Sequence, residues 1–100
     1  MDMWIRIARF DGADGESWDD RIEEIRSRIR AGGPGGERPA GMRVIVGADR
    51  QGGRGANVIL CDSEEDIRRV DEFLNQQTPV GGATRTTSEI YEGVIDEEPS

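Results

Sequence analysis

Residues 58–67 read Val58-Ile59-Leu60-Cys61-Asp62-Ser63-Glu64-Glu65-Asp66-Ile67, an aliphatic run followed at once by a helix start. The run Ala56–Asp62 is short and rich in β-branched residues, which is typical of a strand. A hydroxyl residue followed three positions later by an acid, as in Ser63 and Asp66, is an N-cap pattern. An apolar stripe at helical spacing comes next, formed by Ile67, Val70 and Leu74. The sequence therefore predicts a strand that leads into an amphipathic helix.

The first half of the chain has the same order of patterns. Met3–Phe10 alternates between two unlike faces, which predicts a strand. Ser17-Trp18-Asp19-Asp20 repeats the cap pattern and opens a second helix, whose apolar stripe consists of Trp18, Ile22, Ile25 and Ile29. The arginines and glutamates of this helix are assigned to its other faces. Gly32-Gly33 is expected to end the helix, and a glycine- and proline-rich loop should follow as far as Gly41.

The remaining segments complete a β-α-β-β-α-β order. Met42–Ala48 and Ala56–Asp62 flank a glycine-bearing turn and are predicted to pair as an antiparallel hairpin, and Thr84–Ile95 reads as the last strand. Two right-handed crossovers then place both helices on one face of a four-stranded antiparallel sheet, a ferredoxin-like α+β fold. Residues 1–95 are expected to form this single domain, with 96–100 as a frayed acidic tail.

One face of such a sheet is left without helices, and something must cover its apolar residues. We expect that face to carry Trp4, Arg6 and Phe10. A ligand or a second copy of the sheet would cover it, and the net charge of -8 disfavours RNA, so a homodimer is expected. The last strand is apolar on both of its faces, so the pattern does not assign Tyr91 to either side.

Composition excludes several classes of function. The 100 residues include 21 acidic residues against 13 basic ones, all arginine, and no histidine. Without histidine the chain lacks the usual general base at neutral pH and the commonest metal ligand, so we expect no metal site and no cofactor. The negative net charge repels nucleic acid and anionic membranes, and neither is expected as a partner.

Cysteine usage and hydropathy favour a cytoplasmic protein. Cys61 has no second cysteine with which to form an internal disulfide, and the N-terminus does not resemble a secretion signal. The longest apolar run, Val58–Cys61, is far shorter than the roughly 18 residues of a membrane span. Cys61 itself is expected to be a small buried residue, because no histidine is present to activate it.

Three segments carry a family resemblance: Met3–Gly12, Val58–Ile67 and Ser88–Val94. In these the chain resembles the dimeric α/β-barrel superfamily, and within it the antibiotic-biosynthesis-monooxygenase-like and stress-responsive barrel proteins. The resemblance implies two sheets facing each other across a dyad, with a cavity between sheet and helices or between sheets. Haem-binding, lyase and isomerase branches rely on a histidine that this chain lacks. The branch of cofactor-independent monooxygenases implies instead a pocket for a phenol-like substrate.

Five residues are candidates for such a site, and each has a structural alternative. Arg6 would stabilise a substrate anion or form an ion pair between subunits. Asn57 would hydrogen-bond a ligand or a neighbouring backbone group, and Tyr91 would donate to an oxyanion or serve as a strand and interface residue. Trp4 and Phe10 would bind an aromatic ligand or anchor the dimer.

Three functions follow from these observations. The first is a homodimeric barrel that binds a small apolar or aromatic molecule in a cavity. The second is a cofactor-independent monooxygenase acting on a phenolic or polycyclic substrate, with Arg6, Asn57 and Tyr91 as catalytic residues. The third is a structural or interaction module that presents its acidic helices to a partner. The sequence does not decide whether the protein is an enzyme.

Overall fold

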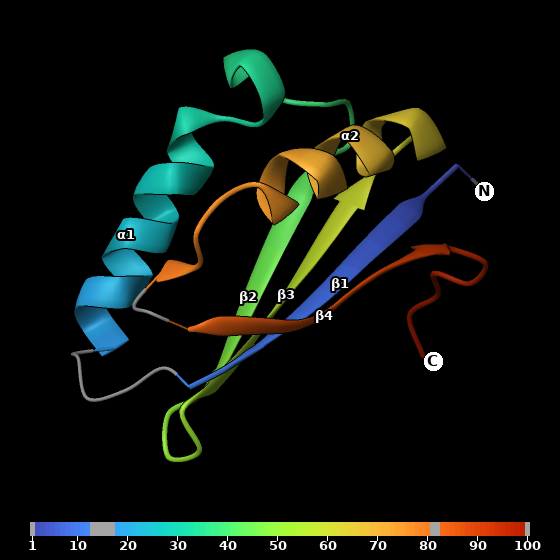
Figure 1. Cartoon of the computed structure of the whole chain (residues 1–100). Coiled ribbons are helices and arrows are strands. Elements are labelled where there is room, and N and C mark those ends of the chain that lie inside the picture. The colour runs from blue at the N-terminus through green and yellow to red at the C-terminus, as the bar shows by residue number, and fades with distance from the viewer. Residues whose placement is uncertain (1, 13–17, 81–82, 100) are drawn as a thin grey trace.

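Two helices and a four-stranded antiparallel sheet make up the molecule (Figure 1). The structure is a computed structural model that describes residues 2–12, 18–80 and 83–99. In chain order the elements are β1 (Trp4–Asp11), α1 (Trp18–Ala31), a 3₁₀ turn η1 (Pro34–Gly36), β2 (Arg43–Asp49), β3 (Arg54–Cys61), α2 (Glu64–Asn75) and β4 (Thr84–Glu92). The strands lie in the order β2-β3-β1-β4. This arrangement confirms the predicted ferredoxin-like α+β fold.

The predicted boundaries are close to the observed ones. Ser63 caps α2, because its hydroxyl oxygen accepts a hydrogen bond of 3.2 Å from the Asp66 backbone N–H. The hairpin between β2 and β3 is closed by Asp49, which accepts from the Gly52 backbone N–H at 3.0 Å and from Arg54 at 2.8 Å. The predicted cap at Ser17 lies outside the described residues.

Strand β4 ends three residues before the predicted end at Ile95. It pairs only with β1, where Glu92 lies opposite Trp4, the first residue of that strand. One further backbone hydrogen bond, from Gly93 to Met3 at 2.8 Å, ends the pairing. Among the residues that the structure describes, β1 begins at Trp4 and offers β4 no partner beyond this point, so the last strand stops although Val94 and Ile95 favour strand structure.

The hydrophobic core lies between α2 and the sheet. Its fully buried apolar members are Ala8 on β1, Ile59 and Cys61 on β3, and Ile67 and Val70 on α2. The half-buried side chains of Trp4, Met42, Val44, Leu74 and Ile90 pack against this cluster. The predicted apolar stripe of α2 is therefore the face that closes the core, and Cys61 is buried there as expected.

The expected assignment of the sheet faces is wrong. Arg6, predicted on the uncovered face with Trp4 and Phe10, is only 1% exposed and bonds to Asp71 of α2. Trp4 packs against the core under α2, and Phe10 also lies on the helix side of the sheet. Alternation along a strand shows which residues share a face, but not which face the helices cover. A buried arginine is tolerated here because α2 and β3 supply its hydrogen-bond partners.

The uncovered face carries the other set of side chains. Ile5 lies opposite Leu60 on β3 and opposite Tyr91 on β4, and Ile7 lies opposite Val58. On the edge strand β2, Ile45 continues this row beside Val58 and is 47% exposed. An apolar surface thus crosses all four strands on the side away from α2. Within the described ranges, no helix has both the length and the apolar character that a membrane span requires.

Candidate functional site

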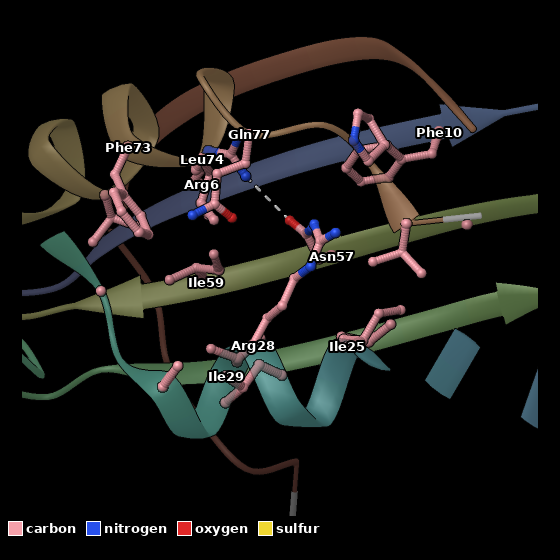
Figure 2. A pocket seen from close by; sticks show the side chains of 18 of the residues that line it. Arg6, Phe10, Ile25, Arg28, Ile29, Asn57, Ile59, Phe73, Leu74 and Gln77 are labelled. Atoms are coloured by element: carbon pink, nitrogen blue, oxygen red, sulfur yellow. Dashed lines mark hydrogen bonds between the residues drawn. The ribbon is translucent and has the colours of Figure 1, made fainter. Parts of the chain in front are cut away.

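A cavity of about 900 Å³ separates α1 from the sheet. Helix α2 crosses the sheet closely, whereas α1 stands apart at the side of the molecule (Figure 1). The cavity lies between the inner side of α1, the helix-covered face of the sheet and the C-terminal end of α2 (Figure 2). Cavities that hold small ligands span roughly 300–1,000 Å³ and have mainly apolar walls. This cavity is therefore large enough for a small organic molecule.

Apolar side chains form most of the cavity wall. On α1, Trp18, Ile25 and Ile29 of the predicted stripe supply them, because residues three or four positions apart share one helix face, whereas Ile22 does not line the cavity. The sheet supplies the facing wall. The last turn of α2 and the loop that follows it in the chain supply the third wall. The apolar side chains that line the cavity include Phe10, Trp18, Ile25, Ile29, Met42, Val44, Val46, Ile59, Phe73, Leu74 and Val80.

Two arginines of α1 also belong to the cavity side of that helix, which differs from the sequence prediction. Arg21 is only 3% exposed, and its guanidinium lies 5.1 Å from the centre of the Trp18 ring. Arg28 lines the cavity as well, and it donates a hydrogen bond of 2.7 Å to the carbonyl of Thr78, in the loop that follows α2. The spacing of Trp18, Arg21, Ile25 and Arg28 places all four on one helix face, so periodicity contained this information.

Arg6, on the helix-covered face of the sheet, donates hydrogen bonds to three side chains. Its Nε donates to Asp71 at 2.8 Å, its Nη1 to the Asn57 side-chain oxygen at 3.2 Å, and its Nη2 to the Asn75 side-chain oxygen at 3.0 Å. Ser88 on β4 also donates to Asp71, at 2.7 Å. These bonds connect α2 to three strands and satisfy a buried cation in the floor of the cavity.

The carboxyl group of Asp71 is ionised in this network. Burial is the largest single influence and disfavours the charged form. The hydrogen bonds from Ser88 and Arg6, together with the positive charge of Arg6, outweigh it and lower the pKa of Asp71 from its ordinary value. Arg6 and Asp71 therefore form a charged pair.

Asn57 has one orientation in this arrangement. A guanidinium only donates hydrogen bonds, so the side-chain oxygen of Asn57 must be the atom that faces Arg6. The Asn57 amide nitrogen then points away from Arg6, and the residue lines the cavity (Figure 2). Arg6 thus orients a hydrogen-bond donor at the cavity wall.

Arg85 of β4 is a further arginine in the cavity wall, and it is not among the site residues predicted from the sequence. Its guanidinium donates to the backbone carbonyls of Leu74 at 2.8 Å and Gln77 at 3.2 Å, at the end of α2, and lies 5.7 Å from the centre of the Phe10 ring. Burial is the main reason that the pKa of Arg85 is lowered from its ordinary value, and the neighbouring charge of Arg6 adds to the effect. No local motif around Arg85 could have indicated this position.

The structure brings together some of the predicted site residues but not all. Arg6, Asn57 and Phe10 line the cavity. Trp4 is on the same sheet face but packs in the core under α2. Tyr91 lies on the uncovered face, opposite Ile5, and its hydroxyl bonds to Glu89. Tyr91 therefore cannot act on the same bound molecule as Arg6 and Asn57 within one chain.

The described part of the chain contains no group of three or more cysteine and acidic side chains arranged to hold a metal ion. Cys61 is buried in the core, and burial raises the pKa of its thiol to about 11. The thiolate, which is the reactive form, is therefore scarce at neutral pH.

Comparisons with known proteins found no match: the chain matches no protein-family model, no curated protein and no solved structure.

Proposed function

We propose that this protein binds a small apolar or aromatic molecule in the cavity between α1 and the sheet. The observation that carries the proposal is the cavity itself, about 900 Å³ in volume and lined mainly by aliphatic and aromatic side chains. Burial of apolar ligand surface against such walls is favourable by about 25 cal/mol for each Å². Three residues of the predicted stripe on α1 support this use, because in this structure Trp18, Ile25 and Ile29 line the cavity instead of closing a core.

A homodimer formed through the uncovered sheet face belongs to the same proposal. This face carries an apolar row made by Ile5, Ile7 and Ile45 with their neighbours on β3. A second sheet can cover a surface of this kind. The resemblance to the dimeric α/β-barrel superfamily, and within it the antibiotic-biosynthesis-monooxygenase-like proteins, supports the same pairing. In such a dimer the cavity lies on the outer side of each sheet, so each chain keeps its own binding site.

A monooxygenase function is the alternative, and one observation favours it. The Asn57 amide, oriented by Arg6, is a hydrogen-bond donor at the wall of an apolar cavity, as stabilisation of a phenolate would require. Tyr91 takes no part in this version, because it lies on the opposite face. Oxygen uptake in the presence of a polycyclic phenol, lost in Asn57→Leu, is the corresponding assay.

Binding is tested with N-phenyl-1-naphthylamine, a neutral apolar fluorophore. We expect saturable binding with enhanced emission. The variant Val46→Glu should weaken binding about tenfold, because it places a charge in the apolar wall and a loss of about 1.4 kcal/mol equals that factor.

Ile45→Glu is the matched control, since Ile45 is the adjacent residue, is 47% exposed against 43% for Val46, and faces the other side of the sheet. It should leave the affinity for the fluorophore unchanged. An absence of saturable binding to the unmodified protein would refute the proposal, as would equal losses in the two variants.

A further inference from the structure

The charged side chains around the cavity are all of one sign. Among the described lining residues, Arg6, Arg21, Arg28, Arg38 and Arg85 are charged, and none is an aspartate or glutamate. The whole chain has the opposite balance, with 21 acidic residues against 13 arginines. Acidic side chains are therefore absent from the described wall of this cavity although they dominate the rest of the surface.

Two of these arginines form ion pairs with carboxylates. Arg6 is paired with Asp71, and Arg28 with Glu24 at 3.2 Å in an exposed one-turn pair of the kind that contributes little. The hydrogen bonds of Arg85 to Leu74, Asn75 and Gln77 all go to backbone carbonyls, which carry no net charge. Arg85 is thus a partly buried cation that donates its hydrogen bonds to dipoles, and the charge of Asp71 also acts on it.

Arg28 and Arg85 reach the same short loop from different elements. Arg28 extends from α1 and donates a hydrogen bond to the Thr78 carbonyl (Figure 2). Arg85 extends from β4 and donates a hydrogen bond to the carbonyl of the preceding residue, Gln77. The two guanidinium groups therefore bond to the carbonyls of neighbouring residues, Gln77 and Thr78, in the loop that follows α2, and both arginines line the cavity at this corner. The apolar walls formed by Ile25, Ile29 and Ile59 adjoin this corner.

We infer that the molecule bound in this cavity is an organic anion with a single acidic group on an apolar or aromatic skeleton, its acidic group held at the corner between Arg28 and Arg85. This inference rests on the proposed binding function and names the chemical class of its ligand. A carboxylate or sulfonate accepts hydrogen bonds from guanidinium groups, and these charge-assisted bonds are about twice as strong as neutral ones. The apolar walls receive the skeleton, and the surrounding arginines disfavour cationic ligands.

Two fluorophores that differ by one charged group test the inference. The anion 8-anilinonaphthalene-1-sulfonate is the sulfonated form of N-phenyl-1-naphthylamine, so their apolar skeletons are the same. We expect the sulfonate to bind at least about tenfold more tightly at low ionic strength, and this preference should shrink as salt screens the arginines. Equal affinities would overturn the inference and leave the binding function intact, whereas failure of both fluorophores to bind would refute the binding function itself.

The variant Arg28→Gln tests whether the preference for the sulfonate arises at this corner of the cavity. It should lower the affinity for the sulfonate several-fold and lower the affinity for the neutral fluorophore by clearly less. Arg26→Gln is the matched control, because Arg26 lies on the same helix in a similar exposed pair, with Glu23 at 2.9 Å, and does not line the cavity. A sulfonate loss as large in Arg26→Gln as in Arg28→Gln would contradict the assignment.

Arg28 also connects α1 to the loop that follows α2. A second variant therefore distinguishes the loss of positive charge from the loss of this connection. Arg28→Lys keeps the charge and should retain most of the preference for the sulfonate. Equal weakening of both fluorophores in Arg28→Gln would mean that Arg28 only holds the cavity wall, and would overturn its role in binding the anion.

Discussion

Arg6 is a buried cation whose stability depends on residues that come together only in the folded chain. Its guanidinium is 1% exposed, and transfer of a charge out of water is costly unless the charge is paired and hydrogen-bonded. Asp71 provides the opposite charge, while Asn57 and Asn75 accept the remaining hydrogen bonds. Removal of the carboxylate alone would leave the cation buried without its counter-charge.

Asp71→Asn is therefore expected to destabilise the protein by about 3 kcal/mol, the range for breaking a buried ion pair from one side. Urea unfolding followed by circular dichroism measures the change. Glu64→Gln is the matched control, because Glu64 is also on α2 and pairs with Arg68 at 2.7 Å, but both side chains are about half exposed. It should leave the free energy of unfolding nearly unchanged. A similar loss in both variants would show that the Arg6 pair is no stronger than a surface pair.

The same pair gives a pH dependence of known sign. The pKa of Asp71 is lower in the folded chain than in the unfolded one, so its contribution to stability is complete above the unfolded value of about 4 and is lost as the pH falls through the folded value. The stability difference between the unmodified protein and Asp71→Asn should therefore be constant near neutral pH and shrink in acid. A difference that stays constant down to the acid limit would contradict this account.

The two helices have different roles as elements. Helix α2 buries Ile67 and Val70 against the sheet and completes the core. Helix α1 buries no aliphatic side chain completely, and side-chain bonds connect it to the rest of the fold, among them Arg28 to Thr78 at 2.7 Å and Asp19 to Arg50 at 3.6 Å. The same amphipathic pattern thus produces a core helix in one half of the chain and a cavity wall in the other.

The connection into β2 depends on one glycine. Gly41 has a φ of +69°, a conformation that side chains disfavour, and a Cβ at this position would overlap the carboxylate of Asp62. Gly41→Ala should therefore destabilise the protein by about 2 kcal/mol. Gly47→Ala, in β2 itself, meets nothing within 4 Å and has no positive φ, so it should be close to neutral in the same urea assay. Equal effects in the two variants would refute the geometric explanation.

In the whole molecule the sheet separates two surfaces with different proposed roles. One face, with Arg6 and Asn57, carries the core and the cavity, and the other carries the apolar row that includes Ile5 and Ile7. Because neighbouring residues of a strand point to opposite faces, adjacent substitutions can address the two surfaces separately.

The homodimer is tested at this scale. The unmodified protein should be a dimer by native mass spectrometry and light scattering, and Ile45→Glu should shift it to the monomer because it buries a charge in the interface. Val46→Glu, on the cavity side of the same strand, should remain dimeric. A monomeric unmodified protein, or dissociation by Val46→Glu as well, would refute a dimer built on this face.

Local patterns were sufficient to predict the elements of this fold. The cap at Ser63, the stripe of Ile67 and Val70 and the hairpin of β2 and β3 all follow from spacing of a few residues, and the structure confirms each of them. The end of β4 was missed because it depends on where β1 begins, which is a property of the paired sheet.

The sequence by itself determined the order of strands and helices and the residues that share each face, because both depend on repeats of two or about 3.6 residues. Only the tertiary structure decided which face of the sheet the helices cover, that Tyr91 is apart from Arg6, and that Arg28 and Arg85 bond to neighbouring carbonyls beside one cavity. Those outcomes depend on contacts between residues far apart in the chain: Arg6 is buried because Asp71, sixty-five positions later, is there to pair with it.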